Sequence, residues 1–135
     1  MKDCLFCKIV NKEIPSNFLY ENENVVAFLD IQPNNPGHTL IVPKEHSRNI
    51  FDIKESTLRE LIVGVKKMAK AVKGGVEADG INIAMNNEPA AGQLVFHAHI
   101  HIIPRFSDDG YKHWPHKLYK EGEASIVAEK IKAQL

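Results

Sequence analysis

Apolar residues along the chain fall into short runs separated by turn-forming residues, a pattern that predicts strands. The first two runs are joined by an Asn-Glu-Asn turn, and a loop rich in proline, asparagine and glycine precedes the third. These three strands are expected at residues 18–21, 25–31 and 39–42. Two more are expected downstream at residues 81–85 and 94–103, the second of them ended by Pro104.

A different period predicts a long helix in the middle of the chain. Apolar side chains recur there at three- and four-residue spacing from Leu58 to Val72. Thr57 and Glu60 have the spacing of a capping box at its start, and the glycines at 74–75 favour its end. Hairpin strands, one long helix and further strands together predict an α+β fold with a mostly antiparallel sheet.

Two short helices complete the expected elements. Residues 4–10 read as a helical turn, and Val127, Ile131 and Leu135, four apart, predict a C-terminal helix. With no repeat or linker visible in 135 residues, we expect a single domain with a C-terminal extension.

Charge and hydropathy exclude several classes of protein. Seventeen basic residues balance seventeen acidic ones, which argues against a nucleic-acid partner held by a basic excess. No apolar run approaches the roughly 20 residues that cross a bilayer, so no membrane partner is expected. The first residues lack the apolar stretch of a secretory signal, and we expect the protein in the cytoplasm.

Three histidines at alternate positions are the strongest chemical signal. On a strand, His97, His99 and His101 would share one face, with alternate Cα atoms about 6.6 Å apart. A neutral imidazole can attack phosphorus, and a neighbouring imidazole can supply a proton near neutral pH. The preceding loop, residues 86–93, carries small residues and amides that could face an anionic oxygen. This row predicts nucleophilic catalysis at a phosphate.

The only two cysteines form the pair Cys4-x-x-Cys7. In a reducing compartment such a pair indicates a metal site or a redox pair rather than a structural disulfide. No thioredoxin-like βαβ pattern surrounds it, which disfavours the redox alternative.

These motifs resemble the histidine triad (HIT) family, and in particular its Hint-like branch. The segment at residues 97–103 has the form His-x-His-x-His followed by apolar residues. Further segments similar to the family lie at residues 4–15, 27–31, 36–44, 91–93 and 113–115. The resemblance implies a HIT domain over residues 1–116, with residues 117–135 as a C-terminal extension carrying a short helix within the same domain.

The resemblance also implies an activity. It suggests a homodimer, its sheet extended across the two subunits, in which each subunit binds a purine nucleotide. Hydrolysis or transfer would occur at the α-phosphate of conjugates similar to adenosine 5′-phosphoramidate. Carried over, His99 would be the nucleophile that forms a nucleotidyl-histidine, and His101 and His38 would orient and stabilise the phosphate.

Other residues take binding roles by the same resemblance. Asn86 and Gln93 would face the phosphate, and Asp30 would accept the ribose hydroxyls. The apolar slot for the base would be formed by Leu5, Phe6, Ile9, Phe28, Leu29, Ile31 and Leu40. Some bacterial-type members bind structural zinc with two cysteines and two histidines, which here would be Cys4, Cys7, His46 and His97. No organic cofactor is implied. Two cysteines without metal and a surface His46 remain the alternative.

Three hypotheses about function stay open. The first is the nucleotide hydrolase or transferase, with a dinucleoside polyphosphate as the other substrate class. Leu94, where Hint-like relatives often have serine, and the long tail keep that substrate open. The second is a zinc-stabilised nucleotide-binding or interaction module with little turnover. The third, a metalloenzyme using a His-x-His pair, lacks a carboxylate in the strand.

Overall fold

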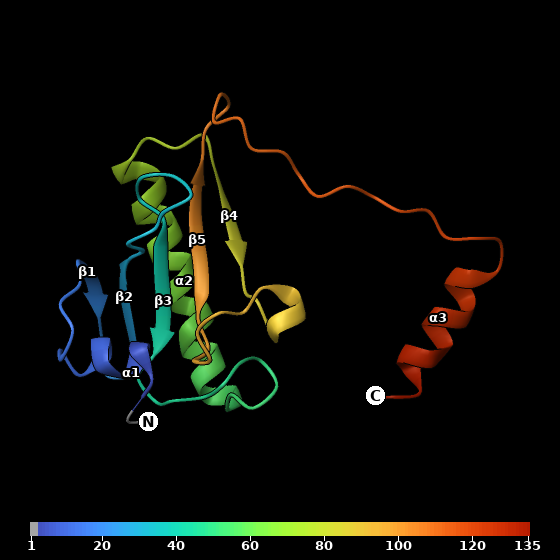
Figure 1. Ribbon diagram of the computed structural model, residues 1–135, viewed down its shortest axis with the longest axis horizontal. Helices are drawn as coiled ribbons and strands as arrows, with labels where there is room; N and C mark the ends of the chain where they lie inside the picture. Colours follow the sequence, from blue (N-terminus) through green and yellow to red (C-terminus); the bar gives the residue numbers. More distant parts are fainter. Residues whose placement is uncertain (1–2) are drawn as a thin grey trace.

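Five antiparallel strands form one sheet in the computed structural model, which describes residues 3–135 (Figure 1). Their order across the sheet is β1-β2-β3-β5-β4. The strands are β1 (Phe18–Glu21), β2 (Val25–Leu29), β3 (Thr39–Pro43), β4 (Gly80–Ala84) and β5 (Ile100–Arg105). The α+β fold with an antiparallel sheet and one long helix is therefore confirmed.

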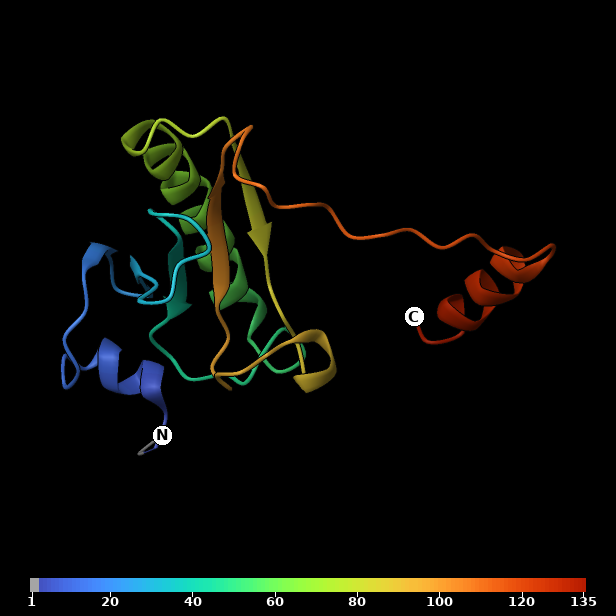
Figure 2. The ribbon, with the colours of Figure 1, turned by 45° about the horizontal axis from the view of Figure 1, so that its top comes forward.

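The two faces of the sheet are covered by different helices (Figure 2). Helix α2 (Glu55–Gly75) packs on the face that carries Ile41, Ile100 and Ile102. Helix α1 (Leu5–Val10) covers the opposite face through Phe6 and Ile9. Because side chains alternate along a strand, His99 and His101 point toward the α1 side. The histidines thus lie on the face that carries only a short helix.

The close approach of α2 to the sheet depends on a glycine in its middle. Gly64 is buried, and a Cβ built on it would lie 2.6 Å from Cδ1 of Ile41 and 3.5 Å from Cγ2 of Val25. The predicted capping box is wrong: the helix begins one turn earlier, with Lys54 as N-cap and no side-chain cap. Glycines at 74–75 close the helix as expected, at Gly75.

We expect Gly64→Ala to destabilise the protein by up to about 2 kcal/mol. Alanine gains about 1 kcal/mol in helix propensity, but forcing a methyl group against the fully buried Ile41 costs about 1–3 kcal/mol. Gly74→Ala is the matched control, since nothing lies within 4 Å of its added Cβ. Urea unfolding measures both; equal or greater stability of Gly64→Ala would contradict the packing argument.

The histidine segment departs from a straight strand. The strand predicted at residues 94–103 begins only at Ile100, and it continues through Pro104 to Arg105, so Pro104 does not end it. Before it, the Ala98 amide donates to the Ser47 carbonyl at 2.8 Å instead of pairing within the sheet. The pairing of residues 94–99 is replaced by contacts with the segment after β3.

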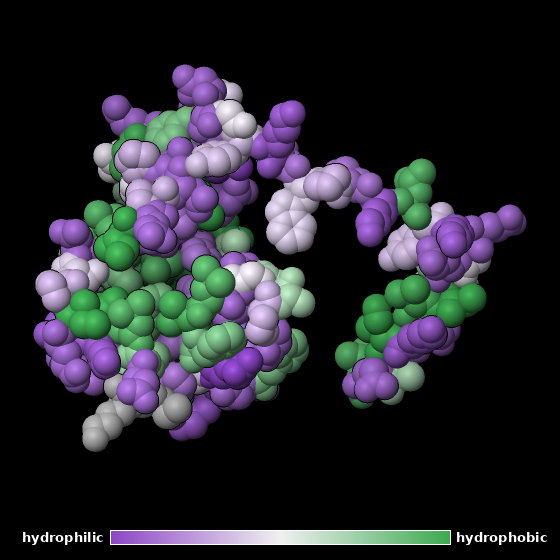
Figure 3. Space-filling view, viewed as in Figure 1, coloured by the Kyte–Doolittle hydropathy of each residue, from purple (hydrophilic) through white to green (hydrophobic). Residues whose placement is uncertain are grey.

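The C-terminal helix α3 (Glu123–Lys132) forms as predicted and stands apart from the sheet at the end of an extended segment (Figure 1). Figure 3 shows apolar surface along this helix. Its residues Ile126 and Ile131 are exposed. The division into a domain of residues 1–116 and an extension of residues 117–135 stays a prediction. Within the described part of the chain, no helix has the length and apolar character needed to cross a membrane.

Candidate functional site

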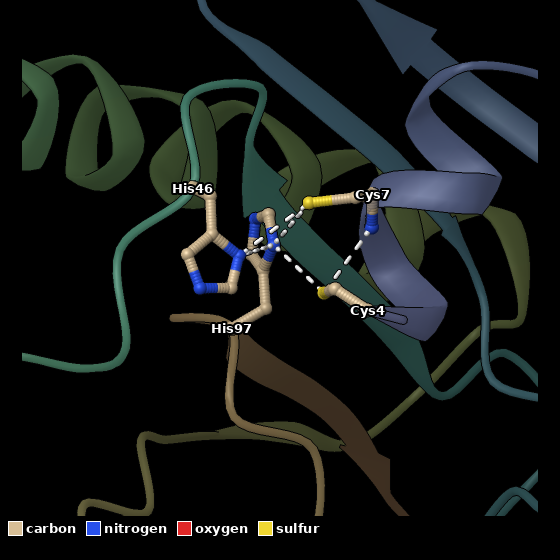
Figure 4. A group of neighbouring side chains, drawn as sticks. All are labelled: Cys4, Cys7, His46 and His97. Carbon is tan, nitrogen blue, oxygen red and sulfur yellow. Dashed lines mark hydrogen bonds between the residues drawn. The ribbon is translucent and has the colours of Figure 1, made fainter. Parts of the chain in front are cut away.

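Four side chains from three separate segments converge beside α1 (Figure 4). Cys4 caps α1 and Cys7 lies in its first turn, with the Cys7 amide donating to Cys4 Sγ at 3.4 Å. His46 follows β3, and His97 precedes β5. The Sγ and ring nitrogen atoms that could bind a cation all lie within 4.8 Å of one another. The structure therefore brings together all four residues that the sequence nominated as metal ligands.

The distances between these atoms fit a tetrahedral zinc. Bonds of about 2.3 Å to sulfur and about 2.0–2.1 Å to nitrogen place nitrogen and sulfur ligands about 3.5 Å apart, and two nitrogens about 3.3 Å apart. His97 Nδ1 lies 3.4 Å from Cys4 Sγ and 3.5 Å from Cys7 Sγ. His46 Nδ1 lies 3.4 Å from Cys7 Sγ and 3.2 Å from His97 Nδ1.

The proton positions of the cluster also suit a metal. His97 Nε2 donates to the Pro43 carbonyl at 2.7 Å, which puts the ring proton there and leaves the Nδ1 lone pair toward the sulfurs. Burial raises the pKa of the Cys7 thiol, and a bound cation would reverse this because the ligand is the thiolate. Four protein ligands would close the coordination shell, as in structural zinc sites.

The next histidine along the chain has the opposite tautomer. His99 Nδ1 donates to the His97 carbonyl at 2.7 Å, so the lone pair lies on Nε2. Phe6 packs edge-on against the ring, with 4.9 Å between ring centroids. Burial lowers the pKa of His99, so that the imidazole is neutral at pH 7 and its Nε2 is available as a nucleophile.

His38 and His101 form a directed hydrogen-bond chain next to His99. The Asn34 amide donates to His38 Nδ1 at 3.1 Å, which leaves the His38 proton on Nε2. His38 Nε2 then donates to His101 Nδ1 at 2.9 Å, and the His101 proton must lie on its own Nε2. The rings of His101 and His99 are 5.0 Å apart. Burial lowers the pKa of His38, and that of His101 to about 4, so both rings are neutral donors.

A second group of possible metal ligands is formed by Asp30 together with His38 and His101 of this hydrogen-bond chain. Asp30 Oδ2 is 3.7 Å from His38 Nε2. Metal binding at that nitrogen would require the proton to move to His38 Nδ1, where the Asn34 amide already donates. The arrangement therefore favours hydrogen bonding over a cation at these residues.

The residues proposed for the base slot divide into two groups. Phe6, Ile9, Phe28 and Leu40 form one buried cluster between α1 and the sheet. Leu29 and Asp30 are half-buried, whereas Leu5 is 44% exposed and Ile31 is 87% exposed. The structure thus gathers four of the apolar residues and leaves the other three outside that cluster.

The loop before the histidines is held by Gln93. Its amide nitrogen donates to the Arg48 and Val95 carbonyls, and its oxygen accepts from the Glu88 amide and from Asn49 Nδ2. These four hydrogen bonds turn the Gln93 side chain toward the protein, so its phosphate contact stays a prediction. Asn86, the other residue proposed for the phosphate, is half-buried, and its Nδ2 would lie 3.7 Å from a Cβ at Gly92.

Sequence reasoning missed the residues that clamp this loop. Glu88 has φ +77°, a region that normally favours glycine, and such strain costs about 1–3 kcal/mol. Its carboxylate accepts from Arg48 at 2.7 Å and from Asn49 at 2.8 Å. The segment that carries His46 is therefore bonded to the segment that precedes His97. Glu88 and its partners are about 40 residues apart in the sequence, so no local spacing predicts their contact.

Comparison with known proteins agrees with this geometry. The family model of the HIT domain matches residues 11–108. An adenosine 5′-monophosphoramidase of Candida albicans is 36% identical over 98% of this chain and 91% of its own length.

Two solved structures are similar over almost the whole chain. One is the protein SMU.412c of Streptococcus mutans, with a TM-score of 0.94 and 44% identity, covering 99% of this chain and 86% of that one. The other is a zinc-bound histidine triad family protein of Mycobacterium smegmatis, with a TM-score of 0.79 and 34% identity, covering 98% of both chains. With the histidine row, the sheet order and the matched model in agreement, this chain belongs to the HIT domain family.

Proposed function

We propose that the protein hydrolyses, or transfers the nucleotide of, adenosine 5′-phosphoramidate-like conjugates through a nucleotidyl-His99 intermediate. The observation that carries this proposal is the 2.7 Å hydrogen bond from His99 Nδ1 to the His97 carbonyl, which leaves a neutral Nε2 lone pair. The hydrolase named in the comparison, an adenosine 5′-monophosphoramidase, supports this class of substrate.

The proposed reaction has two displacements at the α-phosphorus. His99 Nε2 forms a bond to phosphorus as the bond from phosphorus to the leaving nitrogen breaks, and the amine departs with one proton taken up from solvent, which the second step returns. Water then attacks phosphorus, the bond to Nε2 breaks, and AMP leaves. Water thus supplies the hydroxyl group to AMP and, over the cycle, the proton to the amine. The His101 Nε2–H is directed by His38 to stabilise charge on the phosphoryl oxygens.

We propose that Cys4, Cys7, His46 and His97 bind a structural zinc. The fit of the four donor atoms to a tetrahedron supports this, as does the zinc-bound family member. When bound, zinc would hold α1 and the two loop segments together. The chemistry stays with the imidazoles, because all four coordination positions are taken by protein side chains.

A homodimer in the cytoplasm, binding a purine nucleotide and neither nucleic acid nor membrane, is part of the proposal. Strand β4 is an edge of the sheet, and an uncovered edge is a surface on which a second sheet can pair. The apolar residues of the segment that leads to α3 are exposed in a single chain, among them Trp114 and Leu118. Both features favour a second copy as the partner.

We expect the wild-type protein to release AMP from adenosine 5′-phosphoramidate with kcat/KM at least about 10-fold above that for diadenosine tetraphosphate. The physical reason is that the polyphosphate carries several more charges into a site whose histidines are buried and neutral. Chromatographic quantification of AMP at matched concentrations measures both rates. A higher kcat/KM for diadenosine tetraphosphate would instead support a dinucleoside polyphosphate hydrolase. Tight AMP binding without turnover of either substrate would support a nucleotide-binding module.

A further inference from the structure

One carboxylate outside the histidine site accepts an unusual number of hydrogen bonds. Asp109, with its side chain 5% exposed, accepts from Arg105 Nε at 2.7 Å and Nη2 at 3.1 Å. It also accepts from the backbone amides of Phe106 and Tyr111, at 3.1 and 3.0 Å. A fifth bond comes from Asn35 Nδ2 at 3.1 Å. Together the donors hold the Asp109 pKa far below its usual range, chiefly through Arg105.

This cluster joins the turn after β5 to the loop before β3. Asn35 Nδ2 also donates to the Pro104 carbonyl at 2.9 Å, and the Tyr111 hydroxyl donates to the Asn34 carbonyl at 2.8 Å. Gly37, at φ +99°, packs so closely that a Cβ there would lie 3.4 Å from the Pro104 ring. The loop that leads into His38 is thus bonded on one side to residues 104–111.

The same loop sets the proton position of His38. Asn34 accepts from Tyr111 at its carbonyl and donates to His38 Nδ1 from its amide. The His38 amide in turn donates to the Asn35 carbonyl at 3.0 Å. A shift of this loop would remove the donor from His38 Nδ1, and the ring could then place its proton on either nitrogen. With the proton on Nδ1, His38 could no longer donate to His101.

We propose that Asp109 and Tyr111 are positioning residues that hold residues 34–38 so that His38 presents Nε2–H to His101. The inference rests on the proposed function for its catalytic consequence, but the tautomer of His38 is a property of the folded protein alone. Neither residue needs to touch the substrate. Tyr111 is also the start of the extended segment that leads to α3, so this segment is bonded at its origin to the loop of the histidine site.

Tyr111→Phe is the sharpest test because it removes one hydroxyl group and keeps the ring. We expect kcat for AMP release to fall about 3- to 10-fold with KM changed less than twofold, as one lost hydrogen bond permits. We also expect the ¹⁵N chemical shifts of the His38 ring to move toward a mixture of tautomers. Tyr20→Phe is the matched control, since its hydroxyl bonds to Asn22 beside β1, away from His38, and its loss should leave both readouts unchanged.

A second variant, Asp109→Asn, keeps the shape of the side chain at position 109 and weakens its hydrogen bonds to Arg105. It should shift the His38 resonances in the same direction and lower kcat further. Unchanged His38 shifts in Tyr111→Phe would overturn the proposal, even if kcat fell. If the wild type turned over no phosphoramidate, the proposed function would fail, while the chemical shifts would still decide whether Tyr111 positions His38.

Discussion

His99→Ala should lower kcat for AMP release from adenosine 5′-phosphoramidate by about 10⁴-fold or more, since losing a nucleophile removes the covalent route. The alanine protein should still fold. The substitution removes a ring that packs against Phe6 and His101 and that donates to the His97 carbonyl. The hydrogen bonds from Asn34 to His38 and from His38 to His101 do not pass through His99. AMP binding should therefore persist when turnover is gone.

The appropriate control is His116→Ala, which removes an exposed imidazole from the tail. Its turnover should match the wild type within twofold. Rapid quenching of the wild type with radiolabelled substrate should trap label on the protein, and His99→Ala should trap none. Turnover by His99→Ala close to the wild-type rate would mean that the attacking group is another residue or water, and the proposed intermediate would have to be abandoned.

Sequence patterns predicted the elements whose stability is local. Strands β2 and β3 are nearly continuous apolar runs because both faces of the sheet are covered there. Helix α2 carries an apolar stripe at helical period because one side packs on the sheet. The predicted capping box at Thr57 failed for a related reason. The helix begins just after Ile53, which packs against the core between α2 and the sheet, and such tertiary contacts override a weak local preference.

In the histidine site, too, the sequence predicted features that depend on neighbouring residues and missed those that depend on contacts between distant segments. Alternation correctly placed His99 and His101 on one side of the sheet. Alternation could not show that residues 94–99 leave the strand, because that departure depends on Ser47 and Gln93. The ligand role of His97 came from resemblance, since the sequence spacing covers only Cys4 and Cys7.

The carboxylates that accept several hydrogen bonds from distant segments could not be predicted from the sequence. Asp109 sits in an ordinary Asp-Asp-Gly turn, and its bond to Asn35 spans 74 residues. The Glu88 clamp on Arg48 and Asn49 likewise joins distant segments. Such contacts have no period and no fixed spacing, so only the folded chain reveals them.

The four-residue cluster beside α1 leads to the second large expected effect. His46→Ala should reduce bound zinc from one ion per chain to almost none and lower the unfolding midpoint by about 10–15 °C. A ligand present at about 1,000 times its Kd contributes about 4 kcal/mol to stability, and each kcal/mol moves the midpoint by a few degrees in a domain of this size. His46 suits the test because it is a half-buried loop residue, whereas His97 is fully buried and its Nε2 donates to the Pro43 carbonyl.

Elemental analysis and thermal unfolding by circular dichroism measure the two quantities, and His116→Ala is again the control, with unchanged metal and midpoint. Chelation of the wild type should lower its midpoint toward that of His46→Ala. Well below that midpoint, chelation should reduce turnover by less than about 10-fold, because the reacting group is an imidazole and the metal binds no substrate. Complete and immediate loss of turnover on chelation would instead make the metal catalytic. If wild-type protein refolded in the presence of zinc bound none, the zinc proposal would be wrong. The two thiols and two imidazoles would then pack together without a metal.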